Sequence, residues 1–157
     1  MLPPKLALPM TDDAVPTSGC FRNGTHILPI RVYFEDTDAG GIVYHAGYLR
    51  YAERARTEML RCLGIEHTLM LAELGVFFVV REMHVQFHAP ARLDDALEVH
   101  TRTDSASGAR LRLSQTVCSR DVVLVEFALT LACVTREGRP RRWPARVAAA
   151  IANLTRP

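Results

Sequence analysis

The sequence predicts an α+β domain in which a five-stranded antiparallel sheet wraps around one long helix. Three observations support this prediction: an alternating apolar segment at residues 27–34, a long amphipathic segment at residues 46–63, and four segments rich in β-branched and aromatic residues between residues 76 and 135. Strands joined by short turns, with one helix to cover a face, are typical of a two-layer domain. The chain of 157 residues has the length of one such domain.

Residues 1–25 are predicted to be a flexible extension that precedes the domain at residues 26–157. Four of the nine prolines fall in this extension, as do turn-forming pairs such as Asn23-Gly24, and no apolar period is sustained. The prolines also interrupt the apolar stretch of the first ten residues, so we expect no secretory signal there.

The first predicted strand covers residues 27–34, where apolar side chains alternate with others from Leu28 to Phe34. Pro29 has no N–H group to donate, which favours a sheet edge for the start of this strand. The following segment, EDTDAGGIVYH at residues 35–45, contains Asp-Ala-Gly-Gly, a combination that favours a turn. We therefore expect a loop that leads into the helix.

The long helix is predicted from Ala46 to Leu63, where apolar residues recur at helical spacing and arginines and glutamates take most of the other positions. Gly64 is expected to end it. A shorter helical segment, Glu66–Leu74, is expected to follow and to end at Gly75. The apolar stripe of the long helix consists of Tyr48, Ala52, Ala55, Met59 and Leu63.

Four more strands and a short terminal helix complete the predicted domain. The last strand is apolar on both faces apart from Glu126 and Thr130, so we place it centrally, with both faces covered. One antiparallel sheet around one helix is the hotdog arrangement. The strands are expected at residues 76–88, 96–104, 110–120 and 122–135, and the helix at residues 143–154.

Composition excludes several classes of protein. The net charge of +2 is far from that of a strongly basic nucleic-acid binder, and no apolar run reaches the ~18 residues of a transmembrane segment. The cysteines are widely spaced without a CxxC pair, so we expect free thiols in a cytoplasmic protein. The histidines His67, His84, His88 and His100 form no HExxH motif, and no metal is predicted.

The segment YFEDTDAGGIVYHAGYLRYAERARTE at residues 33–58 resembles the signature of the 4-hydroxybenzoyl-CoA thioesterase family, most closely that of the Tol-Pal system-associated acyl-CoA thioesterases. The stretches FVVREMHV at 78–85, APARLDD at 89–95 and RPRRWP at 139–144 match the same group. This resemblance implies a hotdog domain that hydrolyses acyl-CoA thioesters without a cofactor. It also implies a homo-oligomer, either a dimer or a dimer of dimers, that is, a homotetramer.

The resemblance further implies roles for single residues. The second Asp of the DTD motif, Asp38, corresponds to the catalytic carboxylate, and His45 to a histidine near the thioester. Phe34 stands where many relatives have Tyr, so a hydroxyl role is absent there, although the ring is suited to the acyl pocket. The remaining substrate-binding candidates are Gly41, Tyr44, Val80, Arg81 and Arg92, the last three as CoA contacts.

Thioester hydrolysis needs a base or nucleophile together with donors for the developing oxyanion. Asp38 can supply the first, and the N–H groups at the helix start, including that of His45, can supply the second. The sequence leaves open whether Asp38 attacks the carbonyl or deprotonates water, which acyl group is used (we expect short-chain or aromatic), and whether CoA or acyl carrier protein carries it. Asp36 is expected to be structural, while Glu53 and Glu58 on the helix are alternative carboxylates.

Two other functions remain alternatives. One is a non-hydrolytic scaffold that binds acyl-CoA or acyl carrier protein and is linked to cell-envelope machinery. A binding module has no need of the Asp38 carboxylate, which argues against it. The other is a hotdog dehydratase, which would need a histidine with an acidic partner in the hydratase pattern, and that pattern is not found.

Overall fold

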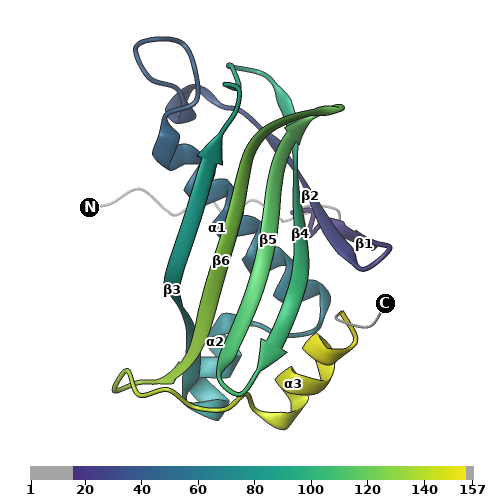
Figure 1. The fold of residues 1–157 in the computed structure, drawn as a ribbon, viewed down its shortest axis with the longest axis vertical. Helices are drawn as coiled ribbons and strands as arrows, with labels where there is room; N and C mark the ends of the chain where they lie inside the picture. The colour runs from purple at the N-terminus through teal and green to yellow at the C-terminus, as the bar shows by residue number, and fades with distance from the viewer. Residues whose placement is uncertain (1–15, 155–157) are drawn as a thin grey trace, which may run out of the picture.

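A computed structural model describes residues 16–154, so most of the predicted extension and the last three residues lie outside the described part. One antiparallel sheet dominates the fold, with the strand order β1-β2-β4-β5-β6-β3 (Figure 1). The strands are β1 Cys20–Arg22, β2 Thr25–Arg31, β3 Val76–Phe87, β4 Ala96–Ser107, β5 Arg110–Ser119 and β6 Val122–Thr135. The helices are α1 His45–Cys62, α2 His67–Leu69 and α3 Ala145–Ala152, with a 3-10 turn η1 Phe34–Asp36 and a π-helical turn η2 Met70–Leu74.

The α+β hotdog prediction is confirmed, but within residues 16–154 the sheet has six strands instead of five. The additional strand, Cys20–Arg22, lies in the segment that we assigned to the extension, and it pairs with β2. Asn23 and Gly24 connect the two strands with φ values of 48° and 76°, as a tight hairpin requires. Three residues are too few to show an alternating pattern, which is why the sequence did not reveal this strand.

Strand β2 ends at Arg31, three residues before the predicted end at Phe34. Phe34 instead begins the turn η1, which Asp36 stabilises by accepting a 2.8 Å hydrogen bond from the Tyr33 N–H. Asp36 therefore has the structural role that we expected. The prediction that the start of this strand lies at a sheet edge is wrong, because Thr25–Ile27 pair with β1 on one side and β4 on the other. Pro29 itself lies beyond the last residue that pairs with β1, so its missing N–H costs no hydrogen bond to β1.

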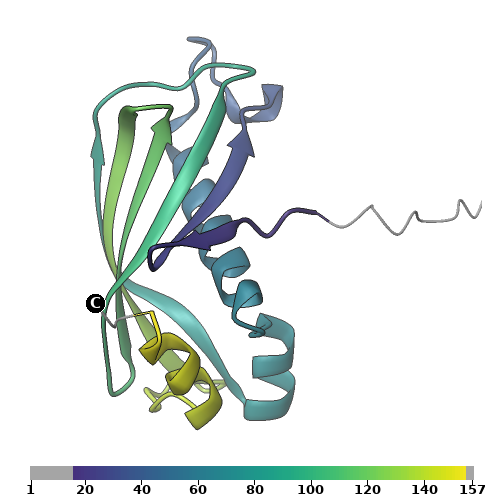
Figure 2. The same ribbon diagram turned by 90° about the vertical axis from the view of Figure 1, so that its right-hand side faces the viewer.

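Helix α1 lies across one face of the sheet, and no helix in residues 16–154 covers the opposite face (Figure 2). Most of the predicted stripe is buried, and Tyr51 adds a side chain that is 1% exposed. Ala52 and Ala55 are fully buried, and their small side chains let the helix approach the sheet closely. Gly64 ends the helix at φ 71°.

Strand β6 lies between β5 and β3, so the prediction of an interior strand is confirmed. The prediction that both of its faces are covered is wrong for the described chain, because Glu126 and Ala128 are exposed on the face away from α1. That face, which we call the outer face, is polar.

The remaining elements follow the sequence prediction closely. The terminal helix α3 falls within residues 143–154 and buries Val147 and Ile151. The short helical segment after α1 becomes α2 and η2 and ends at Gly75. All four cysteines are free thiols, and no described helix is both long and apolar enough to cross a membrane.

Candidate active site

The loop between η1 and α1 is held in place by backbone pairing. Asp38 donates its N–H to the Ile42 carbonyl over 2.9 Å, which closes a tight turn. Val43 donates to the Ala91 carbonyl over 2.9 Å, and Ile42 forms a bridge with Arg92. The loop is therefore fixed against the segment that connects β3 to β4.

The Asp38 carboxylate lies at the exposed tip of this turn. Its Oδ1 accepts a 2.8 Å hydrogen bond from the Gly40 N–H, while the Asp38 carbonyl accepts one from Gly41 over 3.0 Å. Gly41 has φ 73°, a conformation that favours glycine. The second carboxylate oxygen, Oδ2, has no hydrogen-bond partner within residues 16–154, so it is free to meet a substrate or a water.

His45 is the first residue of α1, and its side chain is exposed. The N–H groups of His45 and Ala46 have no acceptor within the helix, because they belong to its first turn. The Tyr44 ring lies 4.2 Å from the His45 ring, centroid to centroid. This end of the helix therefore offers backbone donors and an imidazole side by side.

A pocket of about 410 Å³ brings these groups together. Asp38 reaches it from the loop, His45 from the start of α1, and Phe87 from the end of β3. Apolar and polar groups thus converge in one pocket, which is the usual form of a small-molecule site. The full lining is Asp38, Ile42, Val43, His45, Tyr48, Phe87, His88, Ala89 and Pro90.

Tyr48 fixes the far wall of the pocket. It is 3% exposed, and its hydroxyl oxygen accepts a 2.8 Å hydrogen bond from the Ala91 N–H. Burial raises the pKa of Tyr48, so the phenol stays neutral at physiological pH. Tyr48 also packs edge to face against Phe87, with the ring centroids 6.0 Å apart. Its role is to position the β3–β4 connection against α1.

The predicted site residues fall into two groups. Asp38 and His45 line the pocket, and Gly41 and Tyr44 are their neighbours in the same loop. Four others are absent from the lining. Phe34 is 83% exposed in η1, and Val80 and Arg81 lie where the register of β3 with β6 shifts. Arg92 contributes only its backbone, next to Ile42.

Sequence reasoning missed Tyr48 as a wall of the pocket, and Phe87, His88 and Pro90 as lining residues. Tyr48 was counted only as core, although its helical position one turn after His45 places it on the same side of α1. His88 contacts Glu126 at 2.8 Å, an exposed pair at the pocket's edge. The APARLDD match at residues 89–95 was the available signal, since it marked the connection that forms this wall.

The alternative carboxylates do not line this pocket. Glu53 accepts a 2.8 Å hydrogen bond from Thr57, and Glu58 pairs with Arg61 at 3.3 Å, both further along α1. Asp36 points into η1. Asp38 is thus the one acidic side chain among the lining residues.

Comparison with known proteins gives a consistent result. A family model described as the thioesterase-like superfamily matches residues 32–151. The acyl-CoA thioester hydrolase YbgC of Escherichia coli O6:H1 is 46% identical over 123 residues, which cover 77% of this chain and 91% of that protein. The acyl-CoA thioesterase YbgC of Haemophilus influenzae is 40% identical over 128 residues, covering 81% and 94% of the two chains.

A solved structure agrees with these sequence matches. The probable thioesterase from Bartonella henselae superposes with a TM-score of 0.74 at 40% identity, covering 76% of this chain and 99% of that one.

Proposed function

The chain belongs to the thioesterase-like superfamily, and on that basis we propose that it hydrolyses acyl-CoA thioesters with the Asp38 carboxylate as base or nucleophile. The relatives named as acyl-CoA thioester hydrolase and acyl-CoA thioesterase support the reaction and the substrate class. The observation that carries the residue assignment is the shared pocket, in which Asp38 is the acidic lining residue and His45 lies at the start of α1.

The carboxylate acts from a fixed position. Gly40 holds Oδ1 through its N–H, which leaves Oδ2 to attack the thioester carbonyl or to take a proton from water. Either path needs an ionised carboxylate, and the Asp38 side chain is exposed, so substrate or water can reach it. If Oδ2 attacks, the C–S bond breaks, CoA leaves as thiolate, and water then hydrolyses the mixed anhydride; if Oδ2 takes a proton from water, the hydroxide adds to the carbonyl and expels CoA as thiolate. On either path the CoA thiolate takes up a proton that came from the water.

The start of α1 stabilises the oxyanion that forms on the carbonyl. The unpaired N–H groups of His45 and Ala46 and the positive end of the helix dipole suit a developing negative charge. One donor of this kind contributes about 3 kcal/mol in other hydrolases. We propose that the His45 imidazole adds a second, side-chain donor.

A second copy of the chain completes the site in our proposal. Strand β3 pairs with β6 on one side only, and its other edge has no partner among the described residues. A free edge of twelve residues invites pairing with another subunit, in a dimer or a dimer of dimers. Val80 and Arg81 would then lie at the subunit boundary, where they could meet CoA together with Arg92, while Phe34 and Tyr44 offer rings for the acyl group.

The substrate within this class stays a proposal drawn from the sequence. We propose short-chain or aromatic acyl groups on CoA, with acyl carrier protein as the other possible carrier and the cytoplasm as the location. The Tyr44 ring lies beside His45 and is 50% exposed, so its exposed part is available to pack against an aromatic acyl group.

The test is to compare hydrolysis and binding over a panel of short-chain, long-chain and aromatic acyl-CoAs. We expect turnover on at least one short-chain or aromatic thioester. A non-hydrolysable thioether analogue of the preferred substrate should bind competitively. Binding of the analogue without hydrolysis of any thioester would favour the scaffold alternative, and turnover restricted to long chains would correct the acyl class.

A further inference from the structure

The outer face of the sheet carries a cluster of three potential metal ligands that the proposed hydrolysis does not use. Glu98 and His100 lie on β4, and Cys118 lies on β5 directly opposite Glu98. The carboxylate oxygen, the imidazole nitrogen and the thiol sulfur all lie within 4.8 Å of one another. We propose that Glu98, His100 and Cys118 form a zinc site.

Strand geometry explains how these residues meet. Side chains two apart on a strand share a face, so Glu98 and His100 both point away from α1, while Val99 between them is buried. The register of β5 with β6 shifts between Val117 and Cys118. Bulges of this kind re-aim a side chain, and they recur beside functional sites.

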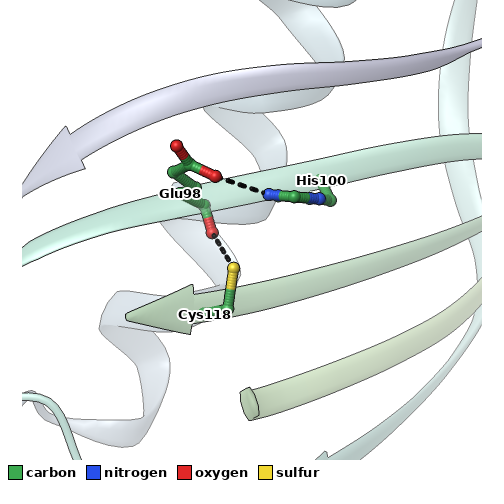
Figure 3. A group of neighbouring side chains, drawn as sticks. All are labelled: Glu98, His100 and Cys118. Carbon is green, nitrogen blue, oxygen red and sulfur yellow. Dashed lines mark hydrogen bonds and ion pairs between the residues drawn. The ribbon is translucent and has the colours of Figure 1, made fainter. Parts of the chain in front are cut away.

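Figure 3 shows the arrangement around Glu98. Its carboxylate turns toward His100, with 2.7 Å between Oε2 and Nε2, while its carbonyl oxygen accepts the Cys118 thiol hydrogen bond over 3.7 Å. Cys118 is 9% exposed, although the outer face around it is polar. A partly sheltered sulfur thus lies close to a half-exposed imidazole and an exposed carboxylate.

The ligand types favour zinc over magnesium and calcium. Thiolate and imidazole are preferred by Zn²⁺, whereas Mg²⁺ and Ca²⁺ prefer oxygen ligands. Tetrahedral zinc places such ligand atoms roughly 3.5 Å apart, so the Glu98 and His100 atoms, now 2.7 Å apart, must separate slightly while the Cys118 sulfur moves closer to them. The Glu98 and His100 side chains are 54% and 35% exposed, which leaves them free to turn inward.

Zn²⁺ binding at this site releases one proton in total. The Cys118 thiol gives its proton to solvent and binds as thiolate, and Glu98 binds as carboxylate. The neutral His100 ring loses the Nε2 proton that it donates to Glu98 and takes one from solvent on Nδ1, so that Nε2 can bind the metal with no net change in the charge of the ring. Three protein ligands leave a fourth position for water. His100 also lines a groove of about 520 Å³ on the outer face, so this position is accessible to solvent.

The experiment titrates the chelator-treated full-length protein with Co²⁺, which reports thiolate binding by a charge-transfer absorption band, and then displaces it with Zn²⁺. We expect one Co²⁺ per chain, and Cys118→Ser should abolish the band. Glu98→Gln, at an exposed position that tolerates change, should weaken binding at least ~10-fold without affecting the fold.

The matched control is Cys62→Ser, because Cys62 also lies beside a histidine, 3.7 Å from His26 Nε2. The control should bind Co²⁺ like the wild type. The proposal is overturned if the wild type shows no stoichiometric band, or if the band survives in Cys118→Ser and disappears in Cys62→Ser. Neither result bears on hydrolysis at Asp38, because the zinc site takes no part in it.

Discussion

Two polar clusters flank the core of this protein, and they differ in how completely their hydrogen bonds are satisfied. Around Asp38 one carboxylate oxygen is held by the Gly40 N–H, and the other is free at an exposed loop. Beneath α1, Arg56 is 8% exposed and donates to the Gln115 side chain over 2.9 Å. Gln115 in turn donates to the Ala52 carbonyl and to Thr101, each over 2.9 Å.

This difference matches the two roles that we propose: Asp38 at the loop for catalysis, and the Arg56–Gln115 hydrogen bonds beneath α1 for stability. A buried guanidinium is costly unless its donors are paired. Both polar atoms of the Gln115 side chain have a partner, and its oxygen accepts from Arg56. Burial lowers the pKa of Arg56, and nearby Glu53 opposes that change. In the loop, by contrast, Asp38 Oδ2 has no hydrogen-bond partner among the described residues, which is tolerated because Asp38 is exposed to solvent. We therefore expect changes beneath α1 to reduce stability and changes at the loop to reduce turnover.

The largest expected effect on stability comes from Gln115→Leu. This change leaves the Arg56 guanidinium buried without its acceptor, and we expect a loss of about 3 kcal/mol in the free energy of unfolding. Urea denaturation measures it, with the exposed Gln86→Leu as the control that should change stability by less than about 0.5 kcal/mol. The double variant Arg56→Met with Gln115→Leu should recover most of the loss, because no charge is then stranded. A single variant as stable as the wild type would contradict the network's role.

Gly40→Ala should reduce turnover and leave stability nearly unchanged, in contrast to Gln115→Leu. A Cβ at this position would lie 3.1 Å from Asp38 Oδ1, so the carboxylate must shift, while the backbone itself can accept alanine. We expect a loss of about tenfold in kcat, or about 1.4 kcal/mol, with the stability nearly unchanged. Steady-state kinetics measures the effect on kcat, and urea denaturation of the same variant measures the effect on stability. Unchanged kcat would mean that the position of Oδ1 does not matter.

Tyr48→Phe removes the acceptor of the Ala91 N–H, a group on a residue that is fully buried. The expected loss is about 1 kcal/mol in the free energy of unfolding, since a buried donor is left unpaired. Tyr33→Phe is the matched control, because Tyr33 is 60% exposed and should tolerate the change. Equal stabilities for both variants would show that water or another group satisfies Ala91.

The smallest effect concerns pH. Burial lowers the pKa of His26, against the raising influences of its hydrogen bond to the Ser18 carbonyl and of Glu58. Below about pH 6.5 the His26 side chain therefore binds a proton in the unfolded chain but not in the folded chain. As the pH decreases, the free energy of unfolding decreases, until the pH is below the lowered pKa of the folded state. Between about pH 7.5 and 5.5 we expect the wild type to lose more stability than His26→Gln does. Identical pH profiles would remove His26 as the cause.

The sequence predicted most of the fold because long periodic segments dominate it. The boundaries of α1 and of the four strands after Gly75 fall within a few residues of the predicted ones. Strand β1 was missed because it is short and pairs through a tight hairpin. Sequence spacing also cannot show contacts across a sheet, which is why the Glu98–His100–Cys118 cluster and the Arg56–Gln115 hydrogen bond emerged only from the structure.

The candidate site was predicted only where its residues are contiguous. Asp38 and His45 lie in one motif, and a single loop brings them to the same pocket. Val80 and Arg81 depend on the free edge of β3, where a second subunit would decide their surroundings. The pocket wall from Phe87 to Pro90 lies at the end of β3, and its position next to the loop depends on tertiary packing. A local sequence pattern cannot predict that position.

The most direct test of the account compares kcat for Asp38→Asn and Asp36→Asn on the preferred acyl-CoA, after both variants are shown to fold. Asparagine at position 38 can still accept the Gly40 N–H, so the turn is kept and the charge alone is lost. We expect a loss of at least ~100-fold in kcat for Asp38→Asn and little change for Asp36→Asn. Full turnover in Asp38→Asn would contradict the assignment of this carboxylate as the catalytic group.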